Sequence, residues 1–263
     1  MPLCRHHRAG VSWQCQSAGF NAIAYPLLNL VAPLETLLDE LFDGKRPPLY
    51  YDVAQWTRAS RRFRTFVETY RVKIRSKISR IRNTDEMADL RAELQTAAIL
   101  LQEPHFVVEY EKHAARKERG ADLTILWKTH TPANIEVRRV RSADLDLADA
   151  DARLVKLIHI LADKIGQTAP SVINLLWIVT EEPISQEDIA RAMQWLRSTA
   201  EQKADAFFVR RGYRGAADFL KRYQQLTAIA VRLPAESILW QNPIARHKLP
   251  APLVAAFQRL QNP

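Results

Sequence analysis

Two acids and one arginine stand inside apolar runs of the sequence, where charge is unexpected and could do chemistry. Asp122 lies at the start of the run 121–128, and Glu136 lies in the run 134–141, two residues before Arg138. Both runs have the two-residue period of a β-strand, which places Glu136 and Arg138 on the same face. A hairpin of the two strands would bring these charged groups together near one end of a sheet.

A third acid, Glu93, lies on the apolar side of a predicted helix, three residues after Leu90 and four before Ala97. Burying a carboxylate is costly unless a cation pairs with it or a metal binds it. Three carboxylates from a helix and two strands suit a hard divalent cation, and Mg²⁺ (or Mn²⁺) is the metal we expect. The candidate metal ligands are therefore Asp122, Glu136 and Glu93.

The elements that position these acids follow from periodicity and from helix-terminal signals. Asn83, followed by two acids within three residues, is a strong helix start, and Pro104 ends the helix that carries Glu93. Beyond this proline the apolar period changes from that of a helix to that of a strand. We expect helices over 27–42, 56–82, 84–102, 149–166, 186–202, 215–225 and 251–261, and strands over 105–112, 121–128, 134–141, 171–180 and 227–233.

This order of elements predicts an α/β fold with a central mixed sheet flanked by helices on both sides. The run 171–180 is almost wholly apolar, which is typical of a central strand covered on both faces. We expect a right-handed crossover from the strand 134–141 to that strand. The predicted organisation is a loose tail over 1–19, a helical extension over 20–84 and an α/β domain over 85–263.

Residues 85–182 resemble the restriction-endonuclease-like PD-(D/E)XK nucleases in the order of their elements and acids: a helix with Glu93, a strand, a strand with Asp122, a strand with Glu136-x-Arg138, a helix and a strand. More loosely, the stretch is similar to bacterial proteins of unassigned activity with the same fold. The resemblance implies a restriction-endonuclease-like core and Mg²⁺-dependent hydrolysis of phosphodiester bonds in DNA. By position, Asp122 and Glu136 correspond to the metal ligands and Glu93 to the supporting helix acid.

Two residues depart from the motif of that family. Arg138 stands where the family has a catalytic lysine, and Ala121 stands where many relatives have a proline. Arginine is permanently charged and cannot act as a base, although it can stabilise charge that develops on a phosphate. The alternative is therefore a catalytically impaired nuclease fold that binds nucleic acid or a protein partner.

The segment 56–82 holds ten basic residues and one acid, Glu68, so it carries as much net charge as the whole chain, which is +9. One face of a long basic helix would bind phosphates without reading sequence, and the binding would weaken with salt. We expect nucleic acid as the partner, DNA rather than RNA, with no membrane contact and a homodimer left open. The alternatives are a solvated helix face or a scaffold for a protein partner. The expected contacts are Arg58, Arg61, Arg64, Arg71, Arg75, Lys77 and Arg82.

The number of cysteines and the lack of a long apolar run limit which classes of protein the sequence can belong to. Two cysteines, Cys4 and Cys15, form no disulfide framework and favour a reducing compartment, so we expect a cytoplasmic protein. The sequence has no apolar run of membrane-spanning length and no glycine-rich phosphate-binding motif. These cysteines with His6 and His7 could bind zinc, but their spacing fits no standard finger.

Each acid also has an explanation without chemistry. Asp122 could be a turn residue. Glu136 and Arg138 could form the exposed face of an edge strand. Glu93 could pair with an arginine. A shared site for all three predicts that they meet in one pocket.

Overall fold

The computed structural model describes residues 34–111, 120–141, 149–166, 170, 172–233 and 237–260. Residues 33–263 belong to one compact unit. The tail 1–19, with the zinc candidates Cys4, His6, His7 and Cys15, lies outside the described residues.

One six-stranded mixed sheet in the order β1-β2-β3-β4-β5-β6 forms the centre of the described chain. β3 runs parallel to β4 and β4 to β5, whereas the pairs β1–β2, β2–β3 and β5–β6 are antiparallel. The predicted α/β class with a mixed sheet is confirmed. The strands are β1 (Phe106–Tyr110), β2 (Leu123–Trp127), β3 (Thr131–Val140), β4 (Ile173–Thr180), β5 (Ala228–Arg232) and β6 (Ser237–Gln241).

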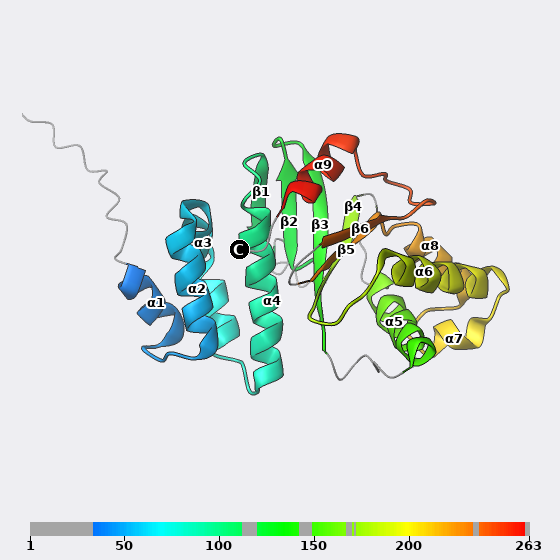
Figure 1. Ribbon diagram of the computed structural model, residues 1–263, viewed down its shortest axis with the longest axis horizontal. Helices are drawn as coiled ribbons and strands as arrows, with labels where there is room; N and C mark the ends of the chain where they lie inside the picture. The colour runs from blue at the N-terminus through cyan, green and yellow to red at the C-terminus, as the bar shows by residue number, and fades with distance from the viewer. Residues whose placement is uncertain are drawn as a thin grey trace, which may run out of the picture. The chain divides into compact units, whose positions relative to one another are not determined.

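Helices cover both faces of this sheet (Figure 1). On one side α4 lies against β1 and β3, α2 and α3 pack against α4, and α1 packs against α2 and α3. On the other side lie α5, α6, α7 and α8. The helices are α1 (Leu34–Phe42), α2 (Pro48–Ala59), α3 (Arg61–Ile78), α4 (Thr84–Leu100), α5 (Ala150–Ile165), α6 (Gln186–Glu201), α7 (Asp205–Val209), α8 (Ala216–Tyr223) and α9 (Ala251–Arg259).

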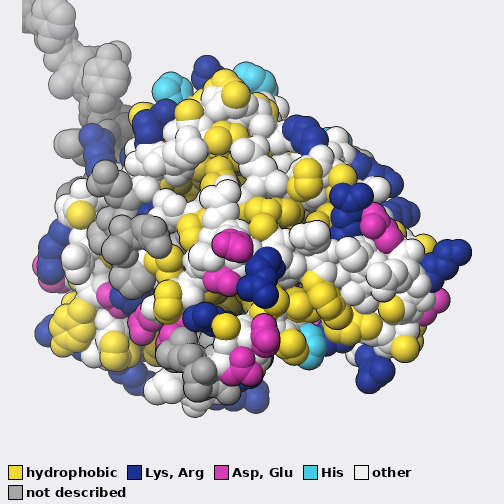
Figure 2. All heavy atoms as spheres, turned by 45° about the vertical axis from the view of Figure 1, so that its right-hand side comes forward, with side chains coloured by type: hydrophobic (Ala, Val, Ile, Leu, Met, Phe, Trp, Pro, Cys, Tyr) yellow, Lys and Arg dark blue, Asp and Glu magenta, His cyan; other side chains and the backbone are white. Residues whose placement is uncertain are grey.

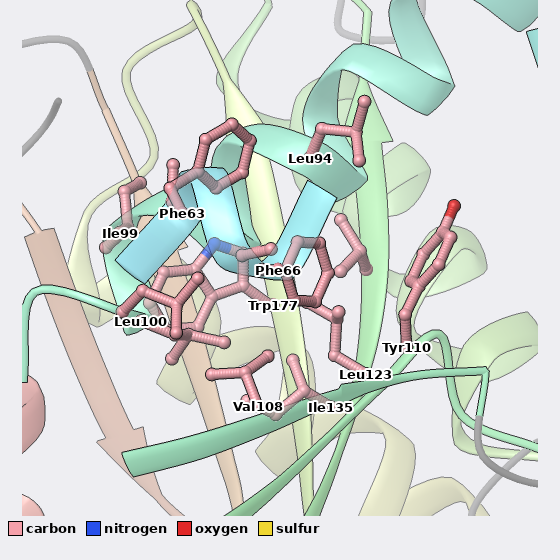
Figure 3. Packing of buried hydrophobic residues seen from close by; sticks show 14 of the residues in the cluster. Phe63, Phe66, Leu94, Ile99, Leu100, Val108, Tyr110, Leu123, Ile135 and Trp177 are labelled. Atoms are coloured by element: carbon pink, nitrogen blue, oxygen red, sulfur yellow. The ribbon is translucent and has the colours of Figure 1, made fainter. Parts of the chain in front are cut away.

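The core on the α1–α4 side joins helical residues before position 84 to the sheet. Figure 3 shows side chains of α3 and α4 packed against strand residues, among them Phe63, Leu94 and Trp177. All three are at most 1% exposed. Burying a large apolar side chain contributes roughly 1.5–3 kcal/mol, so these contacts hold α3 and α4 to the sheet. The described part of the predicted helical extension therefore shares its core with the α/β region.

The core on the opposite face gathers apolar residues of α5, α6 and α8 against β3, β4 and β5. Leu161, Met193 and Phe219, one from each of these helices, are all fully buried. β4 is buried along almost its whole length because helices cover it on both faces, as its apolar sequence predicts. α5 is thereby fixed above the β3–β4 pair.

The predicted single helix over 56–82 is wrong. The chain forms α2 and α3 instead, and they break at Ser60, whose extended backbone has φ −135° and ψ 114°. The Ser60 side chain accepts a hydrogen bond from the N–H of Phe63, 3.2 Å away, and so caps the N-terminus of α3. α2 also begins before the predicted helix, at Pro48, a residue type that favours the first helical position. The sequence reading missed α2 as a separate helix, and it missed α7 and β6.

At one end of the sheet, β3 continues past β2. The last residue of β3 opposite β2 is Ile135, which pairs with Leu123, whereas Glu136–Val140 pair with β4 alone. This overhang leaves one edge of β3 without a neighbouring strand among the described residues, and the predicted chemical residues lie there. None of the described helices is long and apolar enough to span a bilayer.

Candidate functional site

The three predicted acids meet at the overhang of β3. A pocket of about 170 Å³ lies beside the residues of β3 that extend past Leu123, the first residue of β2. Seven charged side chains line it: Asp89, Glu93, Asp122, Glu136, Arg138, Arg139 and Lys164. The four candidate catalytic residues predicted from the sequence therefore lie in one pocket, although they come from three separate segments. Lys164 also lines this pocket and was not predicted.

Asp122 precedes β2 and is tied to the overhang by its side chain. Its Oδ2 accepts a hydrogen bond from the N–H of Val137 at 2.8 Å, and so Asp122 binds part of the free edge of β3. Its main-chain carbonyl accepts from the N–H of Glu111 at 2.9 Å. Burial, with a further contribution from the charge of Glu136, raises the pKa of Asp122 to about 6. The pocket therefore holds two acidic groups that repel each other.

Glu136 faces the side of the sheet that α5 covers. Lys164, in the last turn of α5, places its Nζ 2.7 Å from Oε1 of Glu136. Both side chains are less than a fifth exposed, at 18% for Glu136 and 19% for Lys164. Water screens such a pair less than a surface ion pair, so the lysine is held in place at the pocket wall.

Glu93 approaches the pocket from the α4 side. Its Oε2 accepts hydrogen bonds from Nζ of Lys77 and from the hydroxyl of Tyr110, each at 2.6 Å. In Figure 3 the Tyr110 hydroxyl points away from the other labelled side chains. Burial raises the pKa of Glu93, although Lys77 opposes the rise, and the charge of Asp122 adds to it.

Lys77 joins two acids at this end of the pocket. Its Nζ lies 2.6 Å from Oε2 of Glu93 and 2.8 Å from Oε1 of Glu111. Burial disfavours the charge of Lys77, but the two carboxylates together outweigh it and raise the pKa of its ammonium group. The sequence assigned Lys77 to the nucleic-acid surface, whereas the structure places it beside the candidate site.

The two arginines of the overhang differ in their partners. Arg139 binds Asp89 and Asp85 of α4, with nitrogen–oxygen distances of 2.9 and 2.8 Å. The Arg138 side chain forms no ion pair or hydrogen bond with any residue in the described part of the chain. Arg138 is thus a half-buried cation that can bind an incoming anion.

The donor set has the right chemistry for Mg²⁺, but its arrangement does not support three protein ligands. Among the described residues there is no group of three His, Cys, Asp or Glu side chains that could hold a metal ion. Glu136 points to the α5 side, whereas Glu93 bonds to Tyr110 of the opposite core. The residues therefore fit a cation held by Asp122 and Glu136 alone, and Mg²⁺ commonly takes one or two protein carboxylates.

The structure also bears on the alternative readings in which the three acids and Arg138 have no catalytic role. Glu136 and Arg138 do lie on the part of β3 that extends past β2 and has one open edge, but both side chains line the pocket and are only partly exposed. Glu93 does pair with a basic residue, although that residue is Lys77 and not an arginine. The carbonyl of Asp122 continues the β1–β2 pairing through its hydrogen bond from Glu111, whereas its carboxylate accepts from the N–H of Val137 in β3 and lies near a second acid, Glu136.

Lys164, Lys77 and Tyr110 are the residues of the site that sequence reasoning missed. Lys164 follows Leu157 by seven residues and Leu161 by three, so it falls on the apolar face of α5. A lysine on the buried face of a helix is the same signal that singled out Glu93. The pairing of Lys164 with Glu136, and of Lys77 with Glu93, depends on the tertiary fold.

The basic surface differs from the predicted one in the pairing of its side chains. Arg64 pairs with Glu68, Arg71 with Glu40 and Arg75 with Asp43. The side chains of Arg58, Arg61 and Arg82 are exposed and have no partner in the described ranges. On the face shown in Figure 2, Lys and Arg also lie among Asp and Glu. The concentrated positive face is therefore smaller than the sequence indicated.

Two further cations of the basic segment bind main-chain carbonyls. Arg62 donates to the carbonyl oxygens of Leu101, Glu103 and Phe106. Lys73 donates to those of Tyr110 and Glu111, each at 2.9 Å. These two side chains link α3 to β1 and to its flanking residues.

Substituting Asp122 by asparagine is expected to remove a pH dependence of stability. Between its ordinary pKa of 3.8 and about 6, Asp122 keeps a proton in the folded chain that the unfolded chain loses, so stability falls as pH rises through this window. The loss is about 3 kcal/mol above pH 6. Urea unfolding in EDTA at several pH values should show this fall in the wild type and not in Asp122→Asn. The exposed Asp163→Asn is the control, and equal curves for wild type and Asp122→Asn would contradict the expectation.

Comparison of the chain with models of known protein families, with curated proteins and with solved structures gave no match. The fold and the pocket define the class: an α/β protein with a six-stranded mixed sheet among the described residues, in which partly buried carboxylates and a lysine line one pocket at the overhang of β3. The restriction-endonuclease-like identity of the sheet stays a prediction.

Proposed function

We propose that the chain is a Mg²⁺-dependent nuclease that hydrolyses phosphodiester bonds in DNA. The observation that supports this most is the meeting of Asp122, Glu136 and Lys164 in a pocket that Arg138 also lines. Asp122 and Glu136 would hold the cation, which would supply Lewis-acid polarisation of a phosphodiester. Carboxylates, a lysine and an arginine at one phosphate suit phosphoryl transfer better than other hydrolytic chemistry.

Each protein side chain has a separate part in this proposal. Arg138, which has no partner in the described residues, would bind a non-bridging oxygen of the phosphate. Lys164 would orient the attacking water, because its Nζ is already fixed at Glu136. Glu93 would position Lys77 and Tyr110 at the pocket rim and not bind the cation directly.

The test of this proposal is plasmid nicking by the purified chain with Mg²⁺ or Mn²⁺, compared with the same protein in EDTA. Cleavage that requires the metal supports the proposal. Equal conversion with metal and with EDTA would point to a contaminating activity and would remove the support.

A second candidate is a nuclease fold that binds DNA without cutting it. The specific observation in its favour is that Glu93 and Glu136 are each already neutralised by a lysine. Such a protein would bind DNA fragments in EDTA and leave them intact in Mg²⁺. The two candidates therefore differ in one assay.

Removing the exposed cations at the α2–α3 break is expected to weaken the salt dependence of DNA binding. Arg58 and Arg61 are exposed and lack partners in the described chain, so each can release one counterion when it meets a phosphate. The Arg58→Gln/Arg61→Gln variant should lower the slope of log K against log salt by about two. Binding is measured by fluorescence anisotropy over a salt series.

The matched control for this measurement removes two charges elsewhere. Arg197→Gln/Arg210→Gln, on α6 and just after α7, changes the net charge equally. The same slope in both double variants would show that DNA meets no defined surface at the α2–α3 break.

A further inference from the structure

A second and larger pocket lies at the carboxyl ends of the three parallel strands. Its volume is about 630 Å³, and it lies where β3, β4 and β5 end beside α4. Six charged residues line it: Arg91, Arg139, Arg141, Arg232, Asp85 and Glu181. In open α/β sheets the carboxyl ends of parallel strands are where ligands bind.

The lining is rich in arginine. Among the described residues, four guanidinium groups and two carboxylates line the pocket, and two acids outside the lining, Asp89 and Asp52, bind Arg139 and Arg91. Arg139 and Arg141 share one acid, Asp85, at 2.8 and 2.7 Å. Guanidinium groups that share a carboxylate keep donors for a further anion.

Arg232 is a buried residue of this pocket, so the arginines that line it are not all on the surface. This last residue of β5 is 5% exposed, and its Nη1 donates to the carbonyl oxygen of Leu260 at 3.0 Å. Burial lowers the pKa of its guanidinium group. Placing a cation at this depth is costly, and a bound anion would offset the cost.

We propose that this pocket binds a phosphate group. Phosphate matches planar guanidinium groups, which donate to its oxygens in pairs. The volume exceeds that of a single phosphate, so a nucleotide unit attached to it can enter as well.

Arg139 connects this pocket to the candidate active site. It lines both pockets, and α4 supplies residues to both. The phosphate would thus belong to the end of the strand whose phosphodiester lies at Asp122 and Glu136, and in this form the inference rests on the proposed function. A free phosphate or nucleotide is the other source of the same chemistry.

The experiment measures binding in EDTA, so that no cleavage enters the result. Short single-stranded DNA with a 5′-phosphate, with a 3′-phosphate or with hydroxyls at both ends is titrated, and inorganic phosphate serves as a competitor. We expect one terminal phosphate to tighten binding about tenfold and inorganic phosphate to compete. Arg91→Gln and Arg141→Gln should each remove most of this preference. Both side chains are more than 40% exposed, so these variants should fold.

The control variants separate this pocket from general charge and from catalysis. Arg197→Gln removes one exposed charge on α6 and should keep the preference. Asp122→Asn should also keep it. Preference without any cleavage in Mg²⁺ would reject the proposed function and leave the phosphate site in place.

Competition by inorganic phosphate without a strand preference would assign the site to free phosphate compounds. Lack of both effects would overturn the proposal. A preference that survives in both arginine variants would overturn it as well.

Discussion

Asp122→Asn is expected to reduce Mg²⁺-dependent cleavage of plasmid DNA by about a thousandfold or more. Asparagine has nearly the same shape, and its Oδ1 can still accept the hydrogen bond from the N–H of Val137. What the substitution removes is the negative charge next to Glu136. Loss of a carboxylate that holds the cation removes several kcal/mol of charge stabilisation, and about 4 kcal/mol corresponds to the expected factor.

This substitution separates activity from folding. The buried charge of Asp122 is unfavourable above pH 6, so the variant should unfold at an equal or higher urea concentration than the wild type at neutral pH. A less active but more stable variant is typical of a residue retained for function. Asp163→Asn on α5 should change neither property. Unchanged cleavage by Asp122→Asn would reject the nuclease proposal at this pocket.

Lys164→Met is expected to reduce cleavage by about a hundredfold or more. Methionine keeps much of the length of the side chain but removes the ammonium group 2.7 Å from Glu136. Removing one positioned donor from a reacting centre commonly has an effect of this size. Single-turnover nicking at saturating enzyme measures the chemical step, and Lys156→Met on the same helix is the matched control.

The same assay on Arg138→Lys tests which residue takes the role of the motif lysine, which is to orient the attacking water. If Lys164 orients the water, a lysine at 138 adds no activity, and the loss of the planar guanidinium group weakens phosphate binding. A gain in cleavage by Arg138→Lys, together with an unaffected Lys164→Met, would assign the role to position 138 instead.

The sequence predicted the parts of the fold that depend on local signals. The cap at Asn83 is present, since its side chain accepts from the N–H of Glu86 at 2.8 Å. The strands at 106–110, 123–127 and 173–180 lie inside their predicted ranges because period and apolar length identify strands directly. The shared pocket of Glu93, Asp122 and Glu136 follows from the order of these elements.

The remaining features depend on contacts between distant residues. The apolar spacing of 56–82 continues across Ser60, so periodicity alone could not reveal the break. The pairing of Lys77 with Glu93 and of Lys164 with Glu136 joins residues 16 and 28 positions apart. Such pairs decide how many carboxylates are left for a cation. The residues of the candidate site were therefore predictable from the sequence, whereas their geometry was not.

The carbonyl contacts of Arg62 and Lys73 have a consequence for solubility of the folded chain. β1 is an outer strand of the sheet, and an outer strand offers unpaired main-chain groups to strands of other molecules. Arg62 occupies the carbonyl of Phe106 and Lys73 that of Tyr110, at the two ends of this strand. Arg62 and Lys73, part of the positive charge that suggested a polyanion partner, thus occupy main-chain acceptors that would otherwise be open to intermolecular β-pairing and aggregation.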